Sequence, residues 1–209
     1  LNRQGIWCGV RWEPILGGIN DGEEVLEDFA KKASRYGAKH VSFYPYRSSN
    51  YRLAKKEFES RGFNYRKVLE GALDENWRKI GSLFFGLLRR YGVRASSPDF
   101  VNFPFDSDCE SCCGTDGVVK SYPFTFQRAC LEIKRKGWVS WEDMERIDFR
   151  HPKFYKLAKS CWNGGGSIFT LADSPAVKVV SKDRNGMNVY GRKEDGDGDD
   201  VGFGLEQVR

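Results

Sequence analysis

The first 98 residues alternate between short runs of strand-forming residues and longer amphipathic stretches. The runs at 6–16, 41–44 and 93–96 are rich in strand formers. The stretches between them repeat apolar residues at helical spacing, and two of them end at Gly37 and Gly92. Because each crossover is long enough to hold a helix, neighbouring strands are expected to run parallel. This alternation predicts an α/β fold.

Three parallel strands by themselves leave sheet edges unpaired, which a larger barrel or sheet would cover, and the family resemblance described below implies that residues 1–98 form the C-terminal half of a (β/α) barrel. The chain begins at Leu1 rather than Met, and we expect a fragment whose N-terminal half carries the other strands. Residues 99–182 contain three helical patterns and a cysteine cluster, which predicts a small, mainly helical extension. Residues 183–209 are rich in Gly and Asp and are predicted to form a flexible, disordered tail.

Composition excludes several classes of protein. Hydrophobic residues at 40% and charged residues at 30% rule out a collagen-like or wholly disordered chain. The longest apolar run, at 83–88, is too short to cross a bilayer, so no membrane partner is expected. Six cysteines are too few for a secreted disulfide scaffold, which favours a reducing, cytoplasmic location. Residues 1–182 hold 30 basic and 22 acidic residues, an excess of +8 that suits a polyanionic partner.

The first candidate site follows the opening strand. Arg11 and Glu13 share one face of that strand because side chains alternate, and the strand leads into the turn Gly17-Gly18. In parallel α/β folds, ligands bind at the carboxyl ends of strands, where a glycine turn lets backbone amides approach them. Arg11 suits a carboxylate or a phosphate, so a small phosphorylated ligand is one candidate. The alternative is that Arg11 pairs with Glu13 and the glycines only make a tight turn.

The stretch from Val10 to Tyr44, which reads VRWEPILGGIND, then a capped helix, then GAKHVSFYP, resembles the later barrel strands of radical S-adenosylmethionine (SAM) enzymes. It is most similar to the spore photoproduct lyase-like branch. The resemblance implies that SAM is bound by Arg11, Glu13, Pro14, Gly17, Gly18 and Ser42.

In that family a [4Fe–4S] cluster on a Cys-x3-Cys-x2-Cys motif cleaves SAM, and this sequence contains no such motif. The resemblance therefore implies the C-terminal part of a radical SAM enzyme that is inactive by itself. The complete enzyme would reductively cleave SAM to start radical chemistry, with a nucleic acid as one candidate substrate.

The second candidate site is a cluster of cysteines. Cys109 and Cys112 have the two-residue spacing of metal ligands, Cys113 is adjacent, and Cys130 or Cys161 can supply a fourth thiolate. Thiolates alone do not separate structural zinc from an auxiliary iron–sulfur cluster, and the family resemblance favours iron. The alternative is a set of reduced cysteines or one disulfide.

Remaining features suggest a competing function. Aromatic and basic residues interleave at 43–47, 51–52 and 63–67, a mixture that can stack bases and neutralise phosphates. The alternative function is thus a non-catalytic nucleic-acid-binding module with a structural zinc site. The same residues are equally explained as core aromatics with solvated cations between them. Cys8 is expected in the core, and His40 and His151 are expected to be solvated.

Overall fold

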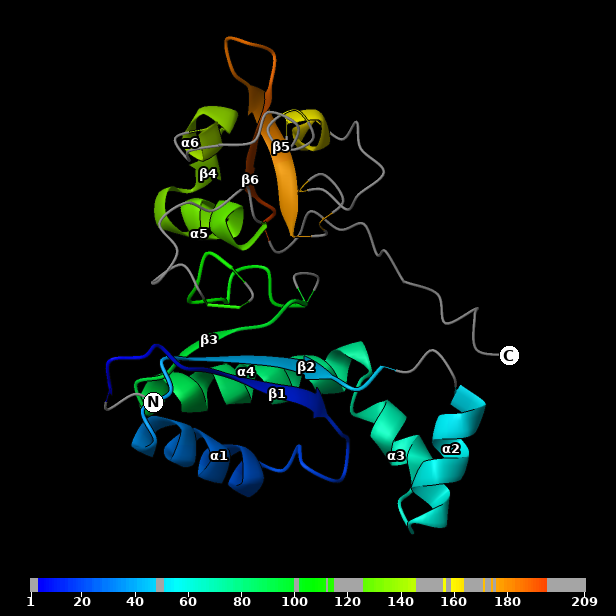
Figure 1. The fold of residues 1–209 in the computed structure, drawn as a ribbon. Coiled ribbons are helices and arrows are strands. Elements are labelled where there is room, and N and C mark those ends of the chain that lie inside the picture. Colours follow the sequence, from blue (N-terminus) through cyan, green and yellow to red (C-terminus); the bar gives the residue numbers. More distant parts are fainter. Residues whose placement is uncertain are drawn as a thin grey trace. The chain divides into compact units, whose positions relative to one another are not determined.

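The computed structural model describes residues 4–47, 51–99, 102–111, 113–114, 126–145, 156, 159–163, 171, 174 and 176–194. The contacts within it divide the chain into two compact units, residues 1–131 and residues 132–209. Each unit is described separately below (Figure 1).

Unit 1 is built on a parallel sheet with strand order β1-β2-β3, which confirms the predicted α/β class. The strands are β1 (Gly9–Ile15), β2 (His40–Pro45) and β3 (Arg94–Ser96). The helices are α1 (Glu23–Arg35), α2 (Tyr51–Ser60), α3 (Tyr65–Glu70) and α4 (Asp74–Arg90). Helices α1 and α4 lie together on one side of the sheet, and α2 and α3 lie beyond its end (Figure 1). The described residues form no closed barrel.

The core of unit 1 lies between the sheet and helices α1 and α4, and it centres on Phe43. The Phe43 ring lies 4.7 Å from Phe85, 4.9 Å from Phe84 and 5.9 Å from Trp77, measured between ring centroids. All four rings are almost completely buried. Burial of an aromatic side chain contributes roughly 2–3 kcal/mol. This packing fixes which face of β2 meets the helices, and the alternating residues must point the other way.

The start of α1 differs from the prediction. A capping box between Asp21 and Glu24 is expected from the sequence, but α1 begins at Glu23 with Gly22 as its N-cap and no side-chain cap. Asp21 instead accepts a hydrogen bond from the Gly18 amide at 2.8 Å. The tight turn before the helix competes for the Asp21 carboxylate.

Unit 2 contains a small antiparallel sheet with strand order β4-β6-β5. Its elements are β4 (Trp138–Val139), α6 (Trp141–Glu145), β5 (Val177–Lys182) and β6 (Asn188–Arg192), and α5 (Phe126–Lys136) runs into it. The sequence also predicts an N-cap at Ser140, from Asp143 three residues later, and the structure confirms it. Ser140 Oγ accepts from the Asp143 amide at 3.4 Å, and the Asp143 carboxylate accepts from the Ser140 amide at 2.8 Å.

A short strand at 176–180 is expected from the sequence and is confirmed as part of β5, whereas the flexible tail is wrong for residues 183–194. Residues 177–192 form a β-hairpin, because β-branched Val177, Val179 and Val180 favour a strand and Asn185-Gly186 supplies the turn. Residues 195–209 lie outside the described residues. Across the described part of the chain, no helix has the length and apolar character needed to span a membrane.

Candidate functional site

The face of the parallel sheet turned away from α1 and α4 carries polar side chains. Strand register places Arg11 beside Ser42 and Ser42 beside Ser96, with His40 one row earlier on β2. A parallel strand covered on both faces normally reads as a continuous hydrophobic run, so polar residues here are a departure that needs a reason. We call this surface the polar face and define it by Arg11, Glu13, His40, Ser42, Tyr44 and Ser96.

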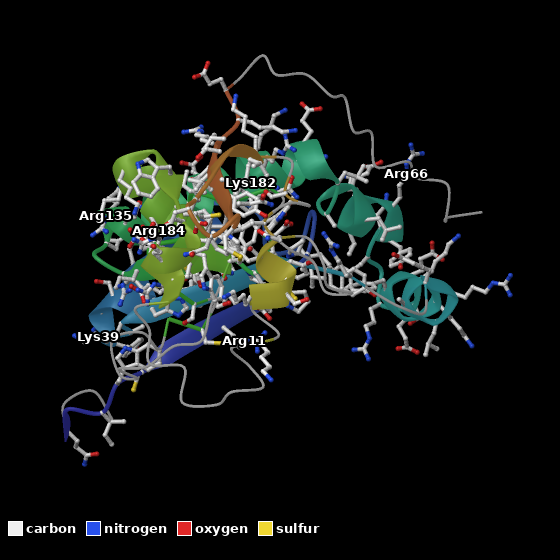
Figure 2. The ribbon with its side chains drawn as sticks, turned by 90° about the horizontal axis from the view of Figure 1, so that it is seen from above. Arg11, Lys39, Arg66, Arg135, Lys182 and Arg184 are labelled. Carbon is white, nitrogen blue, oxygen red and sulfur yellow. The ribbon has the colours of Figure 1, made fainter. Side chains whose placement is uncertain are left out.

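Three residues of the predicted SAM site meet on the polar face. Arg11 forms an ion pair with Glu13 at 2.5 Å, and Ser42 donates a hydrogen bond to the other Glu13 oxygen at 3.1 Å. The Arg11 side chain is 71% exposed, whereas Glu13 is mostly covered. Figure 2 labels Arg11 among the side chains of the molecule. A guanidinium, a carboxylate and a hydroxyl are therefore held together and partly open to solvent.

A second polar group lies at the carboxyl ends of β2 and β3. The Arg47 guanidinium lies 5.0 Å from the centre of the Tyr44 ring and 3.7 Å from the Asp99 carboxylate. Asp99 is buried and accepts a hydrogen bond from Trp77 Nε1 at 2.9 Å. Burial raises the pKa of Tyr44; Arg47 opposes this, while the negative charges of Asp99 and Glu13 add to it. Tyr44 thus presents a neutral hydroxyl near two carboxylates.

Tyr44 and Arg47 belong to segment 43–47, which the sequence suggested only as a nucleic-acid contact, and Asp99 was not selected. Their position at the carboxyl ends of two neighbouring parallel strands was the signal that could have placed them in a ligand site.

His40 is buried, so the expectation that it is solvated is wrong. Its side chain is 1% exposed, and its Nε2 lies 2.8 Å from Ser96 Oγ. The Trp7 ring stacks beside it at 6.4 Å, and a Cβ on Gly114 would lie 2.2 Å from the imidazole ring. Three distant segments of unit 1 enclose this histidine. His151 lies outside the described residues.

The glycine turn after β1 is occupied by its own contacts. A Cβ on Gly17 would lie 2.2 Å from the Lys67 carbonyl oxygen, so α3 packs directly on this glycine. The Gly18 residue has a φ of 70°, and its amide donates to Asp21. Within the loop, the amides of Leu16, Ile19 and Asn20 also donate hydrogen bonds, and the carbonyl of Pro14 accepts one. Together with Gly18, four amides of this turn already have hydrogen-bond acceptors, so they are less suited to bind an anion.

The predicted metal ligands are only partly within the described residues. Cys109 and Cys130 are buried, Cys113 is exposed, and Cys112 lies outside the described residues. Burial raises the pKa of the Cys130 thiol. Among the residues that the structure describes, no three of His, Cys, Asp and Glu come together to hold a metal ion. Because Cys112 is outside the described residues, a metal site on this cluster stays a prediction, and we derive no step through it.

The structure also describes Cys161 and Cys8. Cys161 is buried and belongs to unit 2. Cys8 is only half-buried, with its thiol donating to the Ile6 carbonyl at 3.4 Å, so its assignment to the core is wrong.

The basic and aromatic segments at 43–67 pack largely against themselves. The Phe58 ring contacts Tyr46 at 5.4 Å and Tyr65 at 5.7 Å. Three cations of this region pair with acids on their own helices: Lys55 with Glu59, Arg61 with Glu57, and Arg66 with Glu70. These contacts favour packing aromatics with solvated ion pairs over a surface that stacks bases.

Comparisons with protein-family models, with curated proteins and with solved structures found no match. The function must therefore be inferred from the chain's own residues. Among the described residues, the polar face is where the predicted ligand-binding side chains gather.

Proposed function

We propose that the polar face binds S-adenosylmethionine and that this chain is the C-terminal part of a radical SAM enzyme. The observation that carries the proposal is the contact chain from Arg11 through Glu13 to Ser42 across two neighbouring strands. These are the three predicted ligand residues that meet on one face. The outer edge of β1 pairs with no described strand, which leaves room for a (β/α) barrel to continue there.

The three groups match the polar parts of SAM one by one. The Arg11 guanidinium suits the carboxylate of the methionine moiety, because a planar fork of donors binds a carboxylate bidentately. The Glu13 carboxylate suits the ammonium group, and the Ser42 hydroxyl suits a ribose hydroxyl. Because the Arg11 side chain of this ion pair is largely exposed, the pair contributes little, and the carboxylate and ammonium groups of the methionine moiety can replace Glu13 and Arg11 as each other's partners at little cost.

Bound SAM would supply the adenosyl group for radical chemistry in the complete enzyme, where one electron from a reduced [4Fe–4S] cluster would cleave it and methionine would leave. Arg11, Glu13 and Ser42 of this chain would hold and orient the cofactor. The six cysteines lie at 8, 109, 112, 113, 130 and 161, without the three-cysteine motif, so the cluster ligands must come from other polypeptide. Cofactor binding without cleavage is therefore the activity expected of this chain alone.

The test is isothermal titration of SAM into the full chain. We expect saturable binding of one equivalent, which ATP does not displace. Arg11→Ala should weaken it by about tenfold or more, as expected for loss of a charge-assisted hydrogen bond. The matched control is Arg66→Ala, since Arg66 is also an exposed arginine paired with one carboxylate. An absence of SAM binding, or equal losses in both variants, would contradict the proposal.

A further inference from the structure

The order of elements in unit 2 defines a recognisable topology. Helix α5 leads into β4, and α6 follows after one residue. Residues 156 and 159–162 are helical, and the β5–β6 hairpin comes last, with β6 inserted between β4 and β5. Helix, strand, helix, helix and a β-hairpin, with this sheet order, is the arrangement of winged-helix domains. These are helix-turn-helix variants in which the hairpin is the wing.

The second helical segment is fixed to the sheet by its last residues. Trp162 lies between Trp141 of α6, at 5.7 Å, and Tyr190 of β6, at 5.1 Å. Its indole nitrogen donates to the Asn188 carbonyl at 2.6 Å, and the Asn188 amide donates to Asn163 at 2.9 Å. The helical segment is thus held against β6, at the end of the hairpin next to its turn.

The tip of the hairpin is also ordered by its own hydrogen bonds. Asp183 Oδ1 accepts from the amides of Asn185 at 2.8 Å and Met187 at 2.9 Å, and Gly186 takes the left-handed conformation with a φ of 73°. Lys182 and Arg184 project from this tip and are labelled in Figure 2. A rigid turn that presents two cations is suited to contact phosphates.

Cations also mark the outer side of the helical segment. Lys156 and Lys159 are exposed, whereas Cys161 and Trp162 of the same segment are buried. On the hairpin, the Arg184 side chain is 82% exposed and pairs with Glu142 at 2.9 Å. An ion pair between exposed side chains is weak, so a phosphate can compete for Arg184. Residues 132–194 contain thirteen basic and eight acidic residues, which favours a polyanion, and residues 195–209 add five acidic residues and one basic residue.

We propose that unit 2 is a winged-helix module that binds duplex DNA. The helical segment carrying Lys156 and Lys159 enters the major groove, and the hairpin tip carrying Lys182 and Arg184 contacts the adjacent phosphates. This inference rests on the topology and charges of unit 2 and is independent of SAM binding by unit 1.

The test is fluorescence anisotropy of a labelled mixed-sequence DNA duplex of about 20 base pairs with the full chain, between about 50 and 200 mM salt. Lys182→Glu combined with Arg184→Glu should lower the affinity at least about tenfold and reduce the salt slope by about two. The matched control is Lys55→Glu with Arg61→Glu, the same charge change on α2 of unit 1 and the residue that follows it. We expect the control to bind within about twofold of wild type after correction for its net charge.

Several results would overturn the proposal. These are wild-type binding that does not depend on salt, tighter binding of the single strand or of duplex RNA, and equal losses in the hairpin variant and its control. Thermal unfolding checks that each variant is folded. Should the hairpin variant fail to fold, Lys156→Glu with Lys159→Glu must show the same loss of affinity. Arg11→Ala should leave DNA affinity unchanged, whatever the SAM titration shows.

Discussion

Ser42 of β2 donates its hydroxyl hydrogen bond to Glu13 of β1 at 3.1 Å. The two residues are 29 positions apart, and strand register alone brings them together. Since Glu13 also holds Arg11, this hydrogen bond ties a hydroxyl to an ion pair on the face that we assign to SAM.

Ser42→Ala removes that hydrogen bond while keeping the strand. We expect a loss of about 1 kcal/mol in the free energy of unfolding and a several-fold drop in SAM affinity. Urea unfolding and calorimetric titration measure the two effects. Ser60→Ala is the control, because Ser60 is exposed and donates only to the Glu57 carbonyl. The site assignment would lose its support if Ser42→Ala lowered stability but left SAM affinity unchanged.

Two glycines of α4 should respond in opposite ways to alanine. Gly86 has open space where a Cβ would stand, so Gly86→Ala should stabilise the chain by about 0.5–1 kcal/mol through helix propensity. A Cβ on Gly81 would lie 2.1 Å from the buried Phe103 ring, so Gly81→Ala should destabilise it by about 1–3 kcal/mol. Denaturant unfolding of both variants checks this, and a stabilised Gly81→Ala variant would show that Phe103 does not pack there.

Asp143 should make the stability of unit 2 depend on acid pH. Burial alone would raise the pKa of Asp143, but hydrogen bonds from Lys136 and Ser140 outweigh it and lower the pKa below the ordinary value of 3.8. A carboxylate with a lowered pKa stabilises the fold above the ordinary value, and the stabilisation is lost as the pH falls through the lowered value.

Asp143→Asn should therefore lower the Tm at neutral pH, by an amount corresponding to roughly 1 kcal/mol, and the difference should shrink below about pH 4. Thermal unfolding across this range measures it. Asp28→Asn is the control, since Asp28 belongs to an exposed ion pair with Lys32. A difference that stays constant down to the most acidic pH would contradict the role given to the carboxylate.

The cysteines should differ sharply in reactivity. Burial raises the pKa of Cys130, and Cys109 is also buried, so both thiols should resist iodoacetamide in the folded chain, whereas exposed Cys113 should react. Peptide mass spectrometry measures the labelling before and after unfolding in guanidinium. We expect the same pattern with and without a chelator. Labelling of Cys109 that begins only when a chelator is added would instead indicate a bound metal.

The parallel sheet and the helices between its strands could be predicted from sequence, because apolar residues recur with clearly different periods in the helices and in the strands. The first strand of the hairpin at 177–192 was predicted from its valines, but the turn and the second strand were not. Gly and Asp dominate the composition after residue 183, and they concealed the Asn185-Gly186 turn and β6. Composition over a long window predicts disorder poorly where a short hairpin lies at its start.

The polar face was predictable only in part. Alternation along one strand places Arg11 and Glu13 on the same face, and that step needs local sequence alone. The burial of His40 depends on Trp7, Ser96 and Gly114, which come from three distant parts of the chain. Gly17 shows the opposite case, because its contact with α3 explains a glycine that the sequence reasoning assigned to a ligand.

The most direct test of the SAM assignment is the set of backbone amide shifts in a nitrogen–proton NMR spectrum as SAM is added to the full chain. We predict that the shifts concentrate at Arg11, Ser42 and Ser96 on the polar face. Shifts confined to the loop from Gly17 to Asp21, or no shifts at saturating SAM, would contradict it.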